Sequence, residues 1–582
     1  MSAASAPPIS IAVLPLRAQG LETFLADGFT ESVIQALSRL PGLRVTGRTS
    51  VFAFRGRDLD LRLIGQQLSV GLILEGSLRA NADIIQLKVS LISTSAGHVL
   101  WTNSISRPLG SWFELEAELS EELCKQLLPA LQDPEVRHRH AQAGTENVAA
   151  YDHYLKALHE FRQFRIERIP VALRELDRAL ELDPGFAVAY AARANCMHLL
   201  RILEVAPLED LEGPTQQAIQ MALKLGPQLG ETWLAQAIYL LIYQLDLPAA
   251  HQAFERALFY SPGLPEVHEF YSFYLTVIGA DGAAIAAARR AVEIDPLSPN
   301  MLNSMGYTYF IAGQYQQAIS WFDQALTVSP GHLAAHESKA LTLLKLGETA
   351  QCLQLLEQLS PQHNLSVHRS SMLGLAYGYS GQTEAAREQL AILLKAEEGQ
   401  DHRSFDLDAL LIHQVLGEEE FIRQRLDRIL RSKSKLFLLL THPFLRELRA
   451  SALFRQQLQI HQLDAELGDD GIRIQAETRE SLKISLRDLL YVESEDNYCR
   501  FVWSEEEGVR QQLLRLSIKS AAAQLAATPV VRVHRSYLVH MGQAWTIRRQ
   551  GREMQLRHQL LERSIPVARS SQAQVKALRT NS

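Results

Sequence analysis

The sequence of 582 residues predicts a multidomain chain with an α/β domain first, an all-α repeat solenoid in the middle and a mostly-β domain last. Strand-like and helix-like runs alternate up to about residue 135, and prolines recur every 34 residues in the middle of the chain. Short β-like runs separated by turns fill the C-terminal part. Alternating elements are typical of α/β domains, and a fixed period of this length is typical of helical repeats.

The α/β domain is expected over residues 1–135. Its apolar patterns predict strands at residues 9–14, 43–54, 72–79, 84–92 and 99–105. The helical spacing of other apolar residues predicts helices at residues 21–40, 61–68 and 112–131. Pro41 and Gly42 end the first of these helices, because this dipeptide breaks helical structure.

Four segments of this domain carry a family resemblance: IAVLPL, FLADGFTESVIQALSRLPGLRVTGRTS, LEGSLR and HVLW. They resemble the TolB-like amino-terminal domain that stands beside tetratricopeptide arrays in bacterial regulators. The resemblance implies a fold that binds a ligand or a partner and has no known chemistry. The alternative is a purely structural α/β domain.

Internal repeats occupy residues 145–465. The prolines that define the period are Pro262, Pro296 and Pro330. Small or aromatic residues recur at fixed offsets before these prolines: Ala250, Phe254 and Ala257; Ala284, Ala288 and Ala291; and Ala318, Phe322 and Ala325. This is the tetratricopeptide pattern, in which alanines let two antiparallel helices approach, the phenylalanine fills the gap, and proline closes the second helix.

Tetratricopeptide repeats stack into a solenoid with a concave surface. We therefore predict that a protein or peptide partner binds on the concave face of this array. The alternative is that the array only spaces and orients the domains at its two ends.

Charge is distributed unevenly along the chain. The net charge is −7, yet the residues from Gly471 onward hold 18 Lys and Arg against 11 Asp and Glu, a net of +7. The preceding residues therefore carry −14. From Arg510 onward, 13 basic residues face two acidic ones, Glu553 and Glu562. Such asymmetry predicts an anion-seeking C-terminal domain on an acidic body.

Cysteine use and hydropathy favour a cytoplasmic location. The four cysteines form no CxxC pair or zinc-ligand set, which suits a reducing compartment; they are Cys124, Cys196, Cys352 and Cys499. The N-terminus lacks the basic and apolar regions of a secretion signal. The longest strongly apolar stretch, residues 234–243, is too short to span a bilayer, so no membrane insertion is expected. No cofactor or metal site is indicated.

The mostly-β domain is expected over residues 472–582. Predicted strands cover residues 472–476, 483–486, 490–492, 500–503, 513–517, 530–534, 537–539, 544–548, 553–556 and 564–567. A short helix is expected at residues 518–525 and a final one at residues 571–578. Many short strands with turns between them predict a compact β unit.

Three blocks of this domain carry a second resemblance: LRDLLYVESEDNYCRF, RVHRSYLV and SIPVARSS. In order and spacing they resemble a LytTR domain, a mostly-β DNA-binding module of bacterial response regulators. Its members insert loops, and not a recognition helix, into successive major grooves of repeated sites. The resemblance implies three contact regions, at residues 496–499, at Arg535 and at Arg569, with base contacts from Asn497, Tyr498, Cys499, Arg535 and Arg569. This sequence departs from the family pattern at His540, where Asn is usual, and at Ala568, where Ser is usual.

The residue types suit these contacts. Arginine donates two hydrogen bonds to guanine O6 and N7, and asparagine pairs with adenine. Four more cations are available for phosphates, which add affinity but little sequence information: Arg515, Lys519, Arg548 and Arg549. Alternatives remain for some of these residues. Arg548 and Arg549 also fit a solvated turn, His534 fits a buried hydrogen-bonded side chain, and Cys499 fits a core thiol or a redox switch.

These features together predict a sequence-specific transcriptional regulator that binds double-stranded DNA. Its C-terminal loops read repeated sites, two chains (a homodimer) occupy one operator, and the array and TolB-like domain bind a partner or signal. The sequence lacks phosphate-binding-loop, dinucleotide, zinc-protease and esterase motifs, so no enzymatic activity is expected, and no phosphoacceptor receiver domain is present. The alternative is an interaction scaffold whose C-terminus has only non-specific nucleic-acid affinity.

Overall fold

The structure is a computed structural model that describes residues 9–127, 145–461 and 471–575 with some gaps. The gaps are residues 39, 41–42, 58, 82, 110, 146, 162–165, 204–205, 207, 359–365, 399–404, 434, 477, 479, 486–487, 506–507, 526–529, 542, 544, 551–552, 562 and 573–574. The chain forms two compact units. The first holds residues 1–271, 288–307 and 315–405, and the second holds residues 272–287, 308–314 and 406–582.

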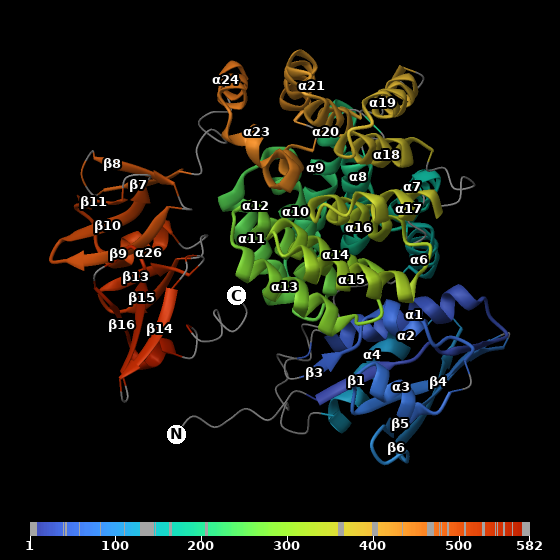
Figure 1. The fold of residues 1–582 in the computed structure, drawn as a ribbon. Coiled ribbons are helices and arrows are strands. Elements are labelled where there is room, and N and C mark those ends of the chain that lie inside the picture. The colour runs from blue at the N-terminus through green and yellow to red at the C-terminus, as the bar shows by residue number, and fades with distance from the viewer. Residues whose placement is uncertain are drawn as a thin grey trace. The chain divides into compact units, whose positions relative to one another are not determined.

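A six-stranded sheet with helices packed against it forms the N-terminal domain (Figure 1). The strand order is β3-β1-β4-β5-β6, with β2 beside β4. Strand β1 is parallel to β3 and β4, whereas β4, β5 and β6 run antiparallel. The strands are β1 (Ile9–Val13), β2 (Arg17–Gln19), β3 (Leu43–Val45), β4 (Leu72–Ala80), β5 (Ile84–Ser93) and β6 (Val99–Pro108). The helices are α1 (Thr23–Ser38), α2 (Arg48–Phe52), α3 (Leu61–Gln67) and α4 (Trp112–Leu127).

The α/β prediction is confirmed, although β2 was not predicted and the strand predicted for residues 43–54 differs. That strand stops at Val45, the last residue with a partner on β1. The chain then turns at the extended Gly47 and starts helix α2. The helix places Val51 in the core with no exposed surface. A short apolar run fits a strand and a buried helix equally well, so the sequence pattern did not distinguish them.

The middle of the chain is a helical array of tetratricopeptide type, as predicted. Its first part contains α6 (Val148–Phe161), η1 (Ile166–Arg168), α7 (Ile169–Leu182), α8 (Ala187–Ile202), α9 (Leu208–Leu225), α10 (Gly230–Tyr239), the π-helix η2 (Leu240–Gln244) and α11 (Leu247–Tyr260). Then follow α12 (Pro265–Val277), α13 (Asp281–Ile294), α14 (Pro299–Ile311), α15 (Tyr315–Val328), α16 (Leu333–Lys345), α17 (Thr349–Gln358), α18 (Ser366–Tyr379) and α19 (Thr383–Glu398). The last are α20 (Asp406–Leu416), α21 (Glu419–Ser432), α22 (Leu436–Thr441), η3 (Pro443–Leu445), α23 (Arg446–Ala450) and α24 (Ala452–Ile460).

The repeat residues pack as the pattern predicts. Ala318, Phe322 and Ala325 on α15 have no exposed surface. A Cβ atom added to Gly306 on α14 would lie 2.5 Å from the Phe322 ring, closer than real Cβ contacts. The glycine therefore lets the first helix of this repeat approach the aromatic side chain of the second.

Glycines in the left-handed region mark the turn between the two helices of several repeats. They are again 34 residues apart: Gly279, Gly313, Gly347 and Gly381, with φ between +73° and +79°. A residue with a Cβ rarely adopts this conformation, so glycine suits the turn. The turn at Gly381 shows that the repeat continues beyond Pro361, where the sequence pattern is less regular.

Buried polar groups join the N-terminal domain to the array within the first unit. The Asp295 carboxylate, 3% exposed, accepts hydrogen bonds from the backbone N–H of Ser50 at 2.7 Å and from its hydroxyl. The backbone N–H of Leu297 donates to the same hydroxyl at 2.8 Å, and that of Gly47 donates to the Ile294 carbonyl at 2.7 Å. A Cβ atom on Gly47 would lie 2.6 Å from Asp295. The first turn of α2 thus meets the array through hydrogen bonds at close approach.

The C-terminal domain contains three small sheets and helix α26 (Ile518–Gln524), which confirms the mostly-β prediction. The sheets have the strand orders β7-β8, β11-β10-β9-β13-β12 and β14-β15-β16. In Figure 1, β14–β16 lie at the opposite end of this domain from β7 and β8. The strands are β7 (Gly471–Gln475), β8 (Ser481–Ser485), β9 (Leu489–Glu495), β10 (Tyr498–Glu505), β11 (Gly508–Leu514), β12 (Val530–His534), β13 (Tyr537–His540), β14 (Trp545–Gln550), β15 (Glu553–His558) and β16 (Ile565–Val567). The 3-10 turn η4 (Arg569–Ser571) follows, and the final helix predicted at residues 571–578 lies largely outside the described residues.

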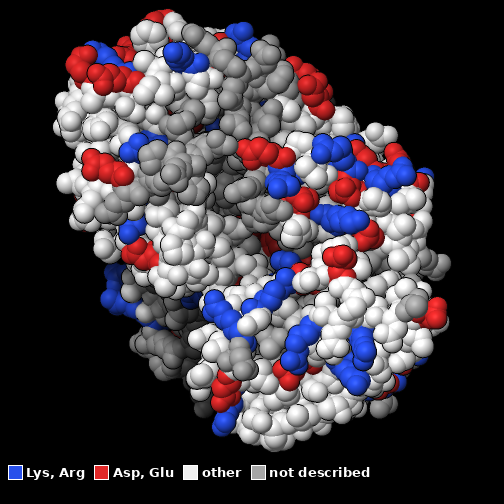
Figure 2. Space-filling view, turned by 90° about the vertical axis from the view of Figure 1, so that its right-hand side faces the viewer, with Lys and Arg blue, Asp and Glu red and all other residues white. Residues whose placement is uncertain are grey.

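The surface carries charges of both signs. Figure 2 shows a face on which basic and acidic side chains are interspersed. Within the described ranges, each helix is too short or too polar to cross a bilayer. The same residues bring together no group of three or more His, Cys, Asp or Glu side chains suited to a metal ion.

Candidate nucleic-acid interface

Strand register brings the predicted contact regions to one end of the five-stranded sheet. Cys499, near the start of β10, pairs with Ser494 on β9 and with Leu514 at the end of β11. The Ser494 N–H donates to the carbonyl of Ser536, in the turn before β13, at 2.8 Å. The turn before β10, the turn before β13 and the end of β11 therefore lie at the same end of the sheet.

The first contact region is a two-residue hairpin turn. Glu495 pairs with Tyr498, so that Asp496 and Asn497 form the turn. Asp496 has a φ of +51°, a conformation that such turns require and that Asp and Asn tolerate best after glycine. Asn497 and Tyr498 are exposed, and Tyr498 keeps 44% of its surface accessible. Both side chains are therefore accessible to a ligand at this end of the sheet.

The second contact region is the turn between β12 and β13. His534 pairs with Tyr537, and Arg535 is exposed in the turn between them. The Arg532 guanidinium donates to the Arg535 carbonyl at 2.9 Å. The Ser536 N–H donates a hydrogen bond to Nδ1 of the partly buried His534 at 3.3 Å. His534 thus supports the turn as a hydrogen-bonded side chain, while Arg535 extends into solvent.

The third contact region lies beside the second. The Ala568 N–H donates to the Val533 carbonyl on β12 at 2.8 Å, and the Ser571 hydroxyl donates to the Arg532 carbonyl at 3.3 Å. Arg569 stands between these two anchors as the first residue of η4, and it is exposed. Because β12 ends at the Arg535 turn, Arg535 and Arg569 belong to one surface.

Two of the predicted phosphate contacts extend this surface. Arg515 follows the end of β11 directly, and Lys519 lies in the first turn of α26. Both side chains are exposed. We call the combined surface the rim, which comprises residues 494–498, 515–519, 534–536 and 568–570.

The other two predicted phosphate contacts lie on β14. Arg548 is exposed in this strand, and not in the solvated turn considered from the sequence. Arg549 pairs with Met554, which pairs in turn with Val567. The Arg549 side chain lies outside the described residues. Since Val567 precedes Arg569 by two residues, this hairpin ends on the side of the rim.

Two carboxylates are neutralised by neighbouring groups: Glu493, beside the rim, and Glu495, within it. Glu493 accepts hydrogen bonds from the Tyr537 hydroxyl at 2.5 Å and from the Arg563 guanidinium at 3.2 Å. Glu495 accepts two hydrogen bonds from the Arg500 guanidinium at 2.5 and 2.7 Å. These bonds from Arg500 lower the pKa of Glu495. Both carboxylates therefore repel a polyanion less than free carboxylates would.

The rim cations are arranged differently. In the part of the chain that the structure describes, these residues form no ion pair: Arg515, Lys519, Arg535 and Arg569. Asp496 is the exposed acid that shares the rim with them. Exposed cations gathered at one end of a domain attract a polyanion, because binding releases the counterions that its charges hold.

Cys499 does not fit the predicted base contact. Its side chain has no exposed surface and packs with Phe501 and Leu514 in the domain core. Successive side chains of a strand point to opposite faces, so Tyr498 points outward and Cys499 inward. A side chain that is fully buried cannot reach a base, and the placement agrees with the alternative of a core thiol.

Of the two departures from the LytTR pattern, His540 lies away from the rim, whereas Ala568 lies within it. His540 is 5% exposed, its carbonyl accepts a hydrogen bond from the Trp545 indole at 2.9 Å, and burial lowers its pKa to about 4. Ala568 acts through its backbone bond to Val533. The buried His540 side chain therefore cannot reach a base in this placement.

Arg532 is a rim neighbour that sequence reasoning missed. It is exposed on β12, beside the buried Val533, and its guanidinium lies against the carbonyl of Arg535. The signal for it was the alternation of basic and apolar residues in RVHR, which places Arg532 on the outer face of the strand.

Three family models match separate parts of the chain. Residues 479–580 match the model described as the LytTr DNA-binding domain. Residues 7–122 match the second domain of HilA/YgeH-like transcriptional regulators, and residues 280–359 match subunit 3 of the anaphase-promoting complex, or cyclosome. The C-terminal domain is thus a LytTR DNA-binding domain. The matched domains are those of a DNA-binding transcriptional regulator with a tetratricopeptide-like array, while the TolB-like resemblance stays a prediction.

Two curated relatives match parts of the chain. A putative adenylate cyclase 3 of Rhizobium meliloti (strain 1021) is 34% identical over 186 residues, which are 31% of this chain and 32% of that protein. Tetratricopeptide repeat protein 7B of Homo sapiens is 29% identical over 121 residues, which are 21% of this chain and 14% of that protein. The chain therefore spans about a third or less of the length of these relatives.

Solved structures with helical repeats also match. A human IFIT1 dimer with PPP-AAAA has 15% identity and a TM-score of 0.39, over 61% of this chain and 78% of that one. A thermophilic TPR protein of Thermus thermophilus has 17% identity and a TM-score of 0.30, over 34% of this chain and all of that one. Nothing about the ligands of this chain follows from likenesses of this size.

Proposed function

We propose that this chain is a sequence-specific transcriptional regulator that binds double-stranded DNA with the rim of its C-terminal domain. The observation that carries the proposal is the meeting of three turns, which expose Asn497, Arg535 and Arg569, at one end of the sheet. Loops of this kind fit the major groove, where each base pair presents its own pattern of donors and acceptors.

Each exposed rim residue has a role that its chemistry suits. Arg535 and Arg569 read guanine through paired N–H donors, and Asn497 reads adenine. Tyr498 contacts a neighbouring base with its ring. The positioning contacts to phosphates come from Arg515, Lys519, Arg548 and Arg549.

The rest of the chain provides control. Two chains occupy one operator as a homodimer on repeated half-sites, and the array and the N-terminal domain bind a protein partner or a signal in the cytoplasm. The cyclase activity in the name of one relative is not carried over, because that match covers 32% of the relative.

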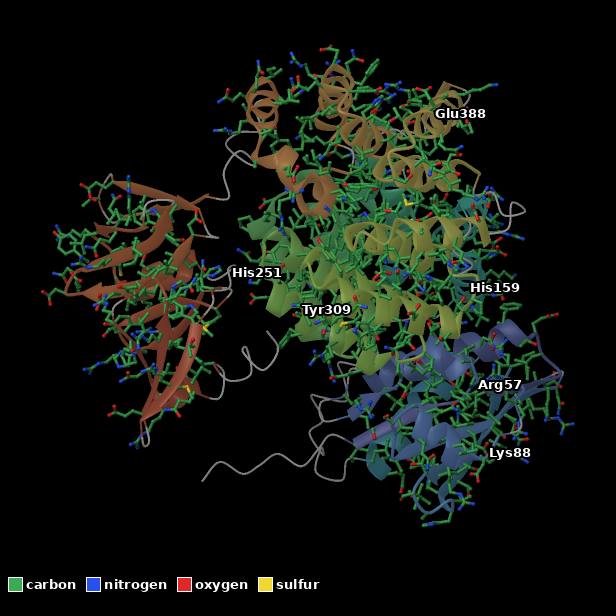
Figure 3. The ribbon with its side chains drawn as sticks, in the orientation of Figure 1. Arg57, Lys88, His159, His251, Tyr309 and Glu388 are labelled. Atoms are coloured by element: carbon green, nitrogen blue, oxygen red, sulfur yellow. The ribbon has the colours of Figure 1, made fainter. Side chains whose placement is uncertain are left out.

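Selection of DNA from a random pool by the full-length chain tests the proposal. We expect a repeated motif to be enriched, and affinity for it to fall steeply with salt. Arg57→Ala and Lys88→Ala serve as matched controls, since both are exposed cations of the N-terminal domain (Figure 3). Salt-dependent binding without any enriched motif would favour the scaffold with non-specific affinity, and absence of binding would refute the proposal.

A further inference from the structure

Aromatic contacts place the segment Leu436–Leu445, near the end of the array, against two earlier helices of the array. On α12, the Phe273 ring lies edge-on to Phe437, with centroids 5.2 Å apart. On α14, the Phe310 ring meets His442 at 5.9 Å and Phe444 at 6.5 Å. All these residues belong to the second unit. The two helices are the first helices of successive repeats, so one segment touches the first helix of each of two repeats.

The contacted surface is formed by two first helices that lie side by side. The hydroxyls of Ser272 on α12 and Thr308 on α14 are 3.0 Å apart, which shows that the two first helices lie side by side. In a tetratricopeptide solenoid, stacked repeats create an extended surface for partners. We call the surface of α12 and α14 around Phe273 and Phe310 the inner face.

The segment has the form of a short peptide ligand. It is a six-residue helix followed by a 3-10 turn that begins with Pro443. Its anchors Phe437 and Phe444 are seven residues apart, and each is 4% exposed. Buried aromatic anchors of this kind dominate the binding energy of many peptide complexes.

Side chains of neighbouring helices donate hydrogen bonds to backbone carbonyls of the segment. The Arg449 guanidinium donates to the carbonyls of Leu439 at 2.9 Å and His442 at 3.0 Å. The Gln414 amide donates to the Phe444 carbonyl at 3.0 Å. The donors lie on α23 and α20, so these two helices position the segment against the inner face.

The entry to the segment is strained. Lys433 and Lys435 have φ of +52° and +48°. These values lie in the left-handed region of backbone conformation, which residues other than glycine and asparagine rarely adopt. The Lys435 ammonium reaches Asp408 at 3.8 Å. Backbone strain of this kind is common where a segment switches between two conformations.

We propose that residues 436–445 are a resident ligand of the inner face. They fill the site at which a partner would insert an apolar peptide with two phenylalanines in a similar spacing, and the partner binds when the segment leaves. The inference rests on the proposed partner-binding role of the array and not on DNA recognition. Competition within the chain lowers the apparent affinity for a partner by the fraction of molecules in which the site is open.

Hydrogen exchange of the unmodified full-length chain tests whether the segment leaves. If the segment is a resident ligand, it leaves the inner face spontaneously. The backbone amides of residues 436–442 should therefore exchange hydrogen at least about tenfold faster than those of the buried α20. Equal rates in the two stretches would mean that the segment is a fixed part of the core, and would overturn the proposal. This measurement involves no DNA, so it is independent of the function proposed for the rim.

Peptide binding tests whether the inner face is a site. The probe is a labelled synthetic peptide with the sequence of residues 433–449, titrated into the full-length chain and followed by anisotropy. Phe437→Ala with Phe444→Ala should bind the probe at least about tenfold more tightly than the unmodified chain. Adding Phe273→Ala to this double variant should remove the gain in affinity for the probe.

Two controls define the outcome. Phe259→Ala removes a phenylalanine that is 70% exposed, and it should bind the probe as the unmodified chain does. A probe with alanine in place of both phenylalanines should not bind. Equal binding by the unmodified chain and the double variant, or a gain that Phe273→Ala leaves intact, would refute the inner-face site. If the double variant loses its helical circular dichroism, the exchange rates of the unmodified chain decide the question.

Discussion

The contact of α2 with Asp295 and the rim of the C-terminal domain use polar groups in opposite ways. At the first, a buried carboxylate meets the N–H and the hydroxyl of Ser50, and each group is satisfied within the chain. At the second, Arg535 and Arg569 are exposed and form no ion pair with a described residue. Satisfied buried groups stabilise a structure, whereas exposed cations remain available for a ligand.

The same distinction separates arginines within the C-terminal domain. Arg500 and Arg563 bind Glu495 and Glu493, while Arg535 is exposed without such a partner among the described residues. Basic composition alone therefore does not identify a DNA contact. What identifies it is a cation that the fold places at an end of the sheet and leaves without a carboxylate.

The largest effect is expected from Asp295→Ala. The substitution leaves the donors of Ser50 and Thr49 unsatisfied in a buried contact, at about 1–3 kcal/mol for each group, so we expect a loss of about 3 kcal/mol in the first unit. DNA affinity should not change. Hydrogen exchange of α2 and the thermal unfolding of the chain measure the loss.

Asp295→Asn is the matched variant for this prediction. It keeps an oxygen acceptor and removes a charge that burial already disfavours, since burial raises the pKa of Asp295. It should therefore lose less stability than Asp295→Ala. Unchanged exchange of α2 in the alanine variant would show that the contact contributes little.

His540→Asn should remove a pH dependence from the C-terminal domain. Burial lowers the pKa of His540 from 6.5 to about 4, so below pH 6.5 the unfolded state binds a proton that the folded state rejects. The stability is complete above pH 6.5 and falls as the pH drops towards 4. At pH 5 the unmodified domain should have lost about 2 kcal/mol that the variant retains, since one pKa unit is about 1.4 kcal/mol.

Pulse proteolysis of the full-length chain in urea at pH 5 and pH 7.5 measures this difference. His159→Asn is the control, because His159 is exposed on α6 in the other unit (Figure 3). A urea midpoint of the C-terminal domain that falls equally in the His540→Asn and unmodified chains would show that His540 titrates freely.

The sequence predicted what local physics decides. The 34-residue period, the alanine and phenylalanine positions around Phe322 and the β-rich C-terminus follow from spacing, and the structure has them. The gaps between strand-like runs predicted turns near Asn497 and Arg535, and the LytTR resemblance singled out these two residues as contacts. These features depend on neighbours in the chain, which a single sequence contains.

The features that the sequence did not predict depend on contacts between residues far apart in the chain. Ser50 and Asp295 are 245 residues apart, and no local pattern links them. The burial of Cys499 beside the exposed Tyr498 depends on strand register, where a shift of one residue exchanges the two faces. The packing of Phe437 on Phe273 likewise depends on the tertiary fold.

Arg535→Ala tests whether the rim reads bases. A bidentate contact to guanine would make it lose about 1–3 kcal/mol on the cognate duplex and relax preference at one base position. Arg535→Lys keeps the charge but loses the planar pair of donors, so it should retain non-specific affinity and lose selectivity. Competition binding on cognate and scrambled duplexes measures both. Equal losses of affinity on the two duplexes would mean that Arg535 contacts the DNA backbone, and base reading would then fall to Arg569 or Asn497.

Lys519→Ala should give the smallest effect and complete the comparison. Its ammonium is a point charge in the first turn of α26, suited to a phosphate and not to a base edge. Losing one phosphate contact releases one counterion fewer, so affinity should fall modestly on every sequence, and the slope of log K against log salt should drop by about one. Arg57→Ala, in the N-terminal domain, should leave that slope unchanged. Titrations of the full-length chain at several salt concentrations on cognate and scrambled duplexes distinguish the two. A loss confined to the cognate duplex would mean that Lys519 takes part in base recognition, whereas an unchanged slope would place it outside the DNA-binding surface and confine the rim to its three turns.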